Sequence, residues 1–200
     1  MKKALLASTL LTSALISGNA VSAVITQLAA PGALTLSNNF ETSKNNADVT
    51  FNSTATIMTA AQATSNVTPS GDKGLVDSVG NAPLIGTLSS ATTSVGMWFG
   101  NDDFNLDFNA VLEIFDGSTL LGSVSVLSNA NDYADQFIGL SSDIAFDSFH
   151  IYYQRPNAQQ LSVYIDDVYL ASTSVPEPAT LTLLGLGLAG IGFSRKKKTA

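Results

Sequence analysis

Between Val24 and Ser174 the apolar residues mostly recur with a period of two, and this period constrains the fold more than any other feature. In the segment 48–58, DVTFNSTATIM, apolar side chains alternate with threonine, asparagine and serine. That alternation is typical of a strand with one buried face and one wet face. No convincing long amphipathic helix interrupts the pattern. The middle of the chain is therefore predicted to be built from strands.

Two of the predicted strands form a hairpin. The runs NAVLEIFD (109–116) and TLLGSVSVLS (119–128) are joined by an Asp-Gly turn, which is a strong hairpin signal. Further strand-like runs cover residues 94–100, 135–142, 146–154 and 161–170, with turn-rich segments between them. This spacing predicts an all-β protein, an antiparallel β-sandwich. The glycine-, asparagine- and serine-rich stretch 65–83 is predicted to be a loop.

The first 23 residues have the composition of an export signal. Lys2 and Lys3 precede an apolar stretch, and the segment ends in Val-Ser-Ala, small residues of the kind that a signal peptidase reads. A short core helix is the alternative, but it does not explain this order of charge, apolar run and small residues. We expect an N-terminal signal helix, cleavage after Ala23 and export of the remainder.

Charge is distributed unevenly along the chain. Between residues 24 and 174 only Lys44, Lys73 and Arg155 are basic, against fifteen acidic residues, which gives a formal net charge of −12. So few basic residues cannot neutralise a phosphate backbone, and nucleic-acid binding is therefore excluded. The charge suits cations or neutral polymers as partners better than acidic polymers.

The chain contains no cysteine. Disulfides, thiol catalysis and thiolate metal sites are therefore excluded, although exported proteins commonly use disulfides. A domain of about 150 residues buries enough apolar surface to fold without such bonds. The domain 24–170 should be stabilised by its own core.

The last part of the chain has three consecutive features. After a short linker, 171–174, come a Pro-Glu-Pro triplet, an apolar segment at 179–193 and a basic end at 195–198. As a helix the apolar segment spans about 22 Å, against about 30 Å for the hydrocarbon core of a bilayer. We expect a short transmembrane helix, with the basic end in the cytoplasm by the positive-inside rule. The residues concerned are Val175, Pro176, Glu177 and Pro178 in the motif and Arg195, Lys196, Lys197 and Lys198 in the basic end.

These three features in this order resemble the PEP-CTERM protein-sorting signal, over the segment 175–198. The resemblance implies an exported protein of a Gram-negative bacterium that makes exopolysaccharide. It also implies a transient inner-membrane anchor and processing by an exosortase, a membrane-embedded cysteine peptidase that cuts near the triplet. Two prolines around Glu177 keep this site extended and outside the helix, where a peptidase can bind it. A plain anchor with an incidental triplet is the alternative.

The predicted domain also resembles a known group. The segments SVGMWFGNDD (94–103), AVLEIFDGSTLLGSVSV (110–126), DQFIGLSS (135–142) and VYIDDVYL (163–170) resemble the jelly-roll ectodomains of PEP-CTERM proteins. Those domains are similar in shape to carbohydrate-binding modules and galactose-binding-like domains. The resemblance implies a jelly-roll-like sandwich, and it implies no particular sugar site, because sugar sites lie in variable loops.

No set of residues indicates catalysis. His150 is the only histidine, and no nucleophile elbow of the G-x-S-x-G type occurs. The doublets Asp102-Asp103 and Asp166-Asp167 place adjacent acids on opposite faces of a regular strand. Neither doublet alone can then flank a sugar bond as a glycosidase requires. We therefore expect a protein without catalytic residues and keep a polysaccharide-degrading enzyme as the weakest hypothesis.

The sequence is consistent with two kinds of binding site, one for a metal ion and one for a sugar. By analogy with the resembled modules, calcium is the cofactor to consider, with one ligand set of Glu41, Asp166 and Asp167 and a second of Asn101, Asp102 and Asp103. Solvated turn acids are the alternative use of these carboxylates. Aromatic residues could stack on sugar rings, although Trp98 lies in a strongly apolar run that favours core packing. The aromatic candidates are Trp98, Tyr133, Tyr152, Tyr153 and Tyr164.

The sequence thus predicts a non-enzymatic surface or extracellular-matrix protein, structural or adhesive in an exopolysaccharide or biofilm context. Its expected partners are signal peptidase, an exosortase, the inner membrane before processing and a polysaccharide. A secreted carbohydrate-binding module or lectin is the second hypothesis.

Overall fold

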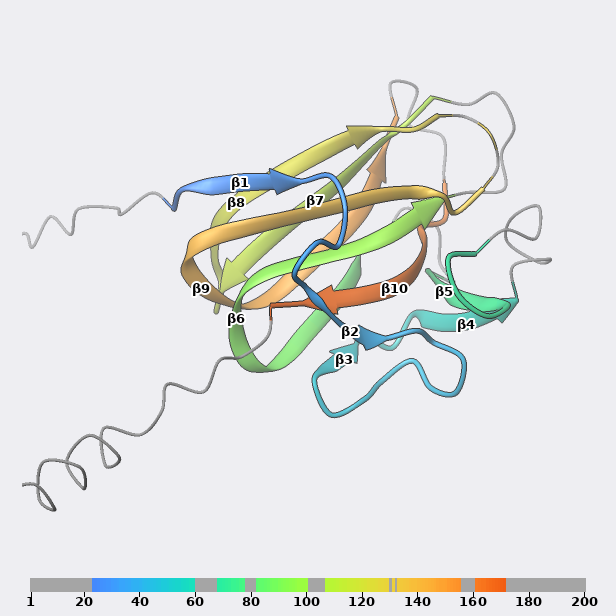
Figure 1. Ribbon diagram of the computed structural model, residues 1–200, viewed down its shortest axis with the longest axis horizontal. Coiled ribbons are helices and arrows are strands. Elements are labelled where there is room, and N and C mark those ends of the chain that lie inside the picture. Colours follow the sequence, from blue (N-terminus) through green and yellow to red (C-terminus); the bar gives the residue numbers. More distant parts are fainter. Residues whose placement is uncertain are drawn as a thin grey trace, which may run out of the picture.

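The computed structural model describes residues 23–59, 68–77, 82–100, 107–129, 131, 133–155 and 161–171 (Figure 1). Within these ranges every regular element is a strand, and the predicted all-β class is confirmed. The predicted signal helix and transmembrane helix lie outside the described residues. The strands are β1 (Ile25–Leu28), β2 (Thr35–Asn38), β3 (Val49–Phe51), β4 (Ala55–Thr59), β5 (Lys73–Asp77), β6 (Leu84–Gly100), β7 (Asn109–Asp116), β8 (Thr119–Leu127), β9 (Gln136–Gln154) and β10 (Tyr164–Leu170).

Two long strands, β6 and β9, connect the two layers of the sandwich. Residues 84–92 of β6 pair with residues 146–151 of β9, and residues 94–99 of β6 pair with residues 136–141 of β9. Between these two pairings the register shifts, and Figure 1 shows both strands curling over. Each strand therefore contributes one half to each layer.

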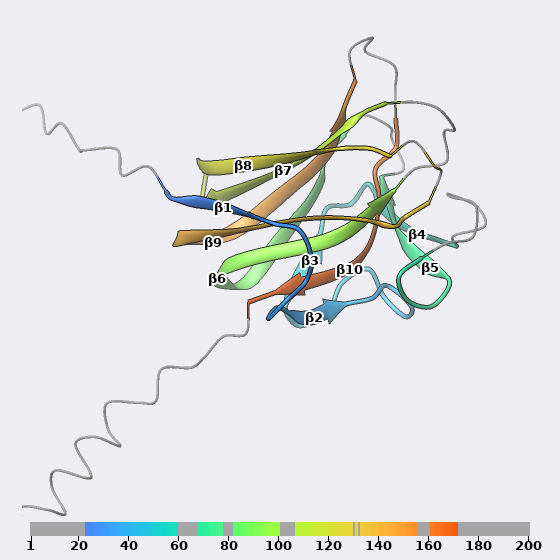
Figure 2. The ribbon, with the colours of Figure 1, turned by 45° about the horizontal axis from the view of Figure 1, so that its top comes forward.

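We name the layers after one strand in each. In the β8 layer the order is β3, β6, β9, β7 and β8. In the β10 layer the order is β4, β5, β10, β6, β9 and β1, and β2 pairs with the far end of β10. All these pairings are antiparallel. Figure 2 shows the two layers from a second direction. The predicted antiparallel sandwich is confirmed.

The core fills the space between the layers, as the alternation predicts. Met97, Phe99 and Ile138 from the β10 layer and Leu112 and Phe149 from the β8 layer are fully buried. Large inward side chains require small neighbours: a Cβ at Gly86 would lie 2.3 Å from the Phe149 ring. Burial of these aliphatic and aromatic groups is the main stabilising contribution to the fold.

The predicted hairpin is also confirmed. β7 pairs with β8 from Asn109↔Leu127 to Asp116↔Thr119, and Gly117 in the turn has φ +57°, which favours glycine. The loop predicted over 65–83 is partly wrong, because β5 lies inside it. KGLVD carries little alternation of its own, but β5 is held between β4 and β10, with Leu75 fully buried.

Candidate functional site

Strand β10 contains two buried acids, which we call the acidic bulge: Asp166 and Asp167. Their exposed fractions are 0% and 4%, so both carboxyl groups are withdrawn from bulk water. The pairing of β10 with β6 shifts register between Asp166 and Tyr169, and Asp167 has φ +48°. The bulge brings both acids inside, whereas a regular strand would place them on opposite faces as the sequence predicted.

The acidic bulge is hydrogen-bonded to a loop that is distant in sequence. Asp167 N–H donates to Asp166 Oδ1 at 2.7 Å, and Ser70 N–H donates to Asp166 Oδ2 at 3.4 Å. The Ser70 hydroxyl donates to Asp167 Oδ1 at 2.6 Å, and Tyr169 OH donates to Asp167 Oδ2 at 3.2 Å. Burial, and next the charge of Asp167, raise the pKa of Asp166 to about 7. At neutral pH this carboxyl group can therefore hold or release a proton.

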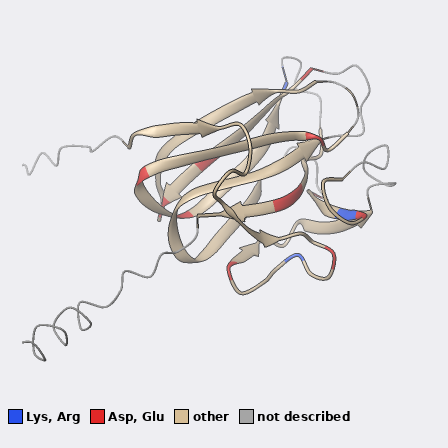
Figure 3. Cartoon of the chain, in the orientation of Figure 1, with Lys and Arg blue, Asp and Glu red and all other residues tan. Residues whose placement is uncertain are grey.

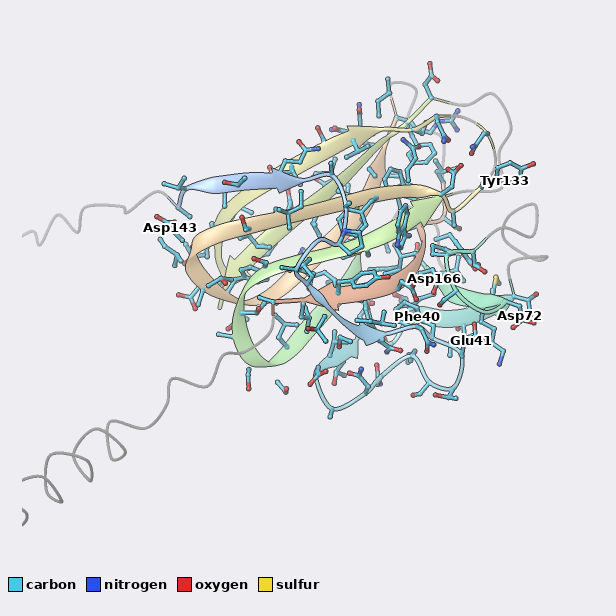
Figure 4. All side chains as sticks on the ribbon, viewed as in Figure 1. Phe40, Glu41, Asp72, Tyr133, Asp143 and Asp166 are labelled. Carbon is cyan, nitrogen blue, oxygen red and sulfur yellow. The ribbon has the colours of Figure 1, made fainter. Side chains whose placement is uncertain are left out.

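Glu41 lies in the same region, as Figure 4 shows, but it binds backbone. Its Oε1 accepts N–H groups of Asp72 at 3.0 Å and Lys73 at 2.9 Å, and Lys73 Nζ donates to the Glu41 carbonyl at 2.8 Å. A Cβ at Gly71 would lie 2.1 Å from the Glu41 carboxylate, and Gly71 has φ +55°. Glu41 thus fixes the loop that precedes β5.

These contacts bear on the predicted calcium ligands. Among the described residues no group of three or more histidine, aspartate or glutamate side chains is placed to hold a metal ion. Glu41, Asp166 and Asp167 share one neighbourhood, since the charge of Glu41 also raises the pKa of Asp166. Oxygens of all three carboxyl groups accept hydrogen bonds from protein groups in this structure. The second predicted set, Asn101 to Asp103, lies outside the described residues.

The outer side of the β8 layer, which we call the β8 face, carries a different set of groups. Tyr152 OH donates to Glu113 Oε1 at 3.0 Å, and the rings of Phe115 and His150 lie 4.3 Å apart. In register across the strands lie Ile85, His150, Glu113 and Ser123. His150 lies on the wetter face of its strand, because its neighbours Phe149 and Ile151 are buried whereas His150 is half-buried. This burial lowers the pKa of His150, and the charge of Glu113 partly opposes the shift.

The aromatic residues that were candidates for sugar stacking differ in how far they are buried. Tyr153 and Tyr164 are buried, and Tyr153 OH donates to the backbone carbonyls of Gly100 and Tyr164, so neither ring can stack on a ligand. Tyr133 is 38% exposed, and Tyr152 is half-buried on the β8 face. Trp98 is half-buried and points away from the core, against the expectation of core packing, and its ring lies 5.4 Å from that of Phe137.

A polar cavity of about 290 Å³ lies where the described chain ends at Ala171. Its lining combines hydroxyl groups from β2 and from the bend of β6 with the Asp48 carboxylate. No aromatic ring lines it, so it offers hydrogen bonds without a stacking surface. The partly exposed aromatic rings lie elsewhere: Tyr152 is on the β8 face, and Trp98 and Tyr133 are outside it.

The functional signal with the clearest match lies beyond the sandwich. Residues 174–196 match the PEP-CTERM protein-sorting motif. The match contains the predicted triplet and reaches Lys196 of the predicted basic end, all outside the described residues. The motif indicates an exported, membrane-anchored protein and implies an exosortase as its processing partner. In the described part of the chain no helix is long and apolar enough to cross a membrane.

Comparison with solved structures gave distant likenesses. One is the crystal structure of the Agl-KA catalytic domain, with 12% identity, a TM-score of 0.38, and coverage of 74% of this chain and 28% of that one. Another is TmCBM61 in complex with β-1,4-galactotriose, with 16% identity, a TM-score of 0.33, and coverage of 66% of this chain and 92% of that one. The chain thus spans little more than a quarter of the first structure. No curated protein matches the chain.

Proposed function

We propose that this chain is a non-enzymatic surface or matrix protein, whose sandwich an exosortase delivers to the cell surface or the surrounding exopolysaccharide. The observation that carries the proposal is the sorting motif at 174–196, which follows the acidic, cysteine-free sandwich. Signal peptidase removes residues 1–23, and the segment 179–193 holds the protein in the inner membrane with its C-terminus in the cytoplasm. The exosortase then acts near Glu177, and the sandwich takes a structural or adhesive role.

The test follows the mass and location of the protein in a host that contains an exosortase. With Pro176→Ala and Pro178→Ala together, the extended site is lost, and the protein should stay in the membrane at full length apart from its leader. Pro69→Ala is the matched control, because this exposed loop proline lies outside the motif. Intact-mass measurement reports both cleavages. Unchanged processing of the double variant, or in a host without the exosortase, would refute the sorting proposal.

The β8 face supports a second function, which is binding of a neutral polysaccharide. Sugar sites combine aromatic surface with a few placed polar groups. Phe115, His150 and Tyr152 supply rings beside the Glu113 carboxylate, and Ser123 and Ser125 supply exposed hydroxyls. Acidic positions are spread over the described part and basic positions are few (Figure 3), which disfavours acidic polymers.

Affinity electrophoresis in gels containing neutral polysaccharides tests this function. Wild-type protein should be retarded, and Phe115→Ala and Tyr152→Ala should each lower the affinity severalfold. Tyr133→Ala is the matched control, because Tyr133 is exposed and lies outside the β8 face. Retardation that is equal in all four proteins would exclude the β8 face as the binding surface.

A further inference from the structure

Strand β8 is an edge strand of unusual length for this protein. On one side it pairs with β7 along its whole length. Among the described residues no strand pairs with its other side, although Ile25 of β1 packs against Gly122. The other described edge strands are short: β3 has three residues, β1 and β2 have four and β4 has five, against nine in β8. A short edge is one of the ways in which proteins prevent strand pairing between molecules. Strand β8 lacks this protection.

The sequence of β8 also lacks the usual protective residues. TLLGSVSVL contains no charge and no proline, and none of the three basic residues of the domain lies on it. Leu120 and Leu127 are 53% and 60% exposed. They lie opposite Phe115 and Asn109 on β7, so both belong to the outer side of the layer. The one irregularity, between Ile114 and Phe115, leaves the pairing of residues 122–127 regular.

We propose that β8 is a self-association edge, at which two copies of this chain pair antiparallel through their β8 strands. An antiparallel copy brings the Leu120 end of each strand beside the Leu127 end of its partner, so the exposed leucines cover each other. An uncharged strand also lets two domains of formal charge −12 meet without like charges in the seam. In Figure 2, β8 lies at the upper margin of the sandwich, where a second molecule can approach.

The association is weak and depends on concentration. Nine residues of strand span about 30 Å, and one pair of edges with two leucine contacts buries less than the roughly 1,200 Å² of a stable interface. Proteins anchored in one membrane or held in one matrix meet at a high local concentration, where weak pairing is effective. Pairing would also join the β8 faces of two molecules into one surface.

The first experiment measures the mass of the full chain by light scattering over a range of concentrations, in mild detergent. The wild-type dimer fraction should rise with concentration, and Ser125→Lys should stay monomeric at concentrations where the wild type is mostly dimeric. Thr87→Lys is the matched control: Thr87 is exposed on the same face, but its strand β6 is paired on both sides. It should dimerise like the wild type.

The second experiment uses the absence of native cysteine. Ser123→Cys, near the centre of β8, should give disulfide-linked dimers on mild oxidation, whereas Thr50→Cys, exposed on the short edge strand β3, should not. The proposal is overturned by a wild type that is monomeric at all concentrations, by equal dimerisation of Ser125→Lys, or by equal cross-linking at both cysteines. Sorting does not depend on this edge, and the sugar-binding test substitutes Phe115 on β7 and Tyr152 on β9, so these outcomes leave the proposed function untouched.

Discussion

The buried carboxyl group of Asp166 should make the stability of the sandwich fall as the pH rises. Its pKa is raised from 3.8 to about 7 in the folded protein, because the charged form loses hydration and lies beside Asp167. Below about pH 4 the folded and unfolded chains both carry the proton. Between about pH 4 and 7 only the folded chain keeps it, so the free energy of unfolding decreases with rising pH. Above about pH 7 the loss is complete.

The size of the effect follows from the shift in pKa. One pKa unit corresponds to about 1.4 kcal/mol, so a shift from 3.8 to about 7 gives an upper bound of about 4 kcal/mol lost between these pH values. In Asp166→Asn the side chain cannot ionise, and its Oδ1 can still accept the Asp167 N–H. The variant should therefore lack this part of the pH dependence and be more stable than the wild type at pH 8.

The assay is equilibrium unfolding in urea at pH 4.5, 6 and 8, followed by the fluorescence of Trp98, the single tryptophan. Asp116→Asn is the matched control, because Asp116 is exposed in the hairpin turn, and its pH dependence should equal that of the wild type. The reasoning fails if Asp166→Asn has the same slope as the wild type. It also fails if the wild type and the control are as stable as Asp166→Asn at pH 8 but less stable than it at pH 4.5. That result would be the opposite of the expected pH dependence.

Three smaller predictions concern single contacts. Tyr153→Phe removes the buried hydroxyl that is hydrogen-bonded to the carbonyls of Gly100 and Tyr164, and should lower the free energy of unfolding by about 1–3 kcal/mol in urea titration. Gly71→Ala forces a Cβ against the Glu41 carboxylate at a positive φ and should cost about 1–3 kcal/mol by the same measurement; a neutral result would contradict the contact. Val24 N–H donates to Asp143 Oδ1 at 2.7 Å, and cleavage after Ala23 would place an ammonium group there. Asp143→Asn should then lower the free energy of unfolding of the cleaved protein alone, by less than about 1 kcal/mol. The effect should disappear in high salt, because salt screens exposed charges.

Alternation along single strands was enough to predict much of this fold. The hairpin of β7 and β8 depends on the local period of two and on one Asp-Gly turn. The whole hairpin, from Asn109 to Leu127, is one short continuous segment of the chain. The class of fold and the burial of most strand residues follow from the same pattern.

Features that depend on distant partners could not be predicted in this way. Strand β5 forms because β4 and β10 lie on either side of it, although its own sequence looks like a loop. The division of β6 and β9 between two layers depends on where their mutual register shifts, which no local pattern indicates. Burial of both Asp166 and Asp167 depends on a bulge opposite β6 and on Ser70, almost a hundred positions away.

The acidic bulge is also where the protein departs most from the rules that stabilise a fold. Two adjacent acids are buried, one has a left-handed backbone, and their hydrogen bonds come from one serine, one tyrosine and the bulge itself. Such departures are expected at functional sites, because they do not contribute to the stability of the fold. If polysaccharide binding persists in Phe115→Ala and Tyr152→Ala, Asp167 is therefore the next residue to substitute. A loss of binding in Asp167→Asn, with unfolding by urea unchanged, would place the sugar at the acidic bulge instead of the β8 face.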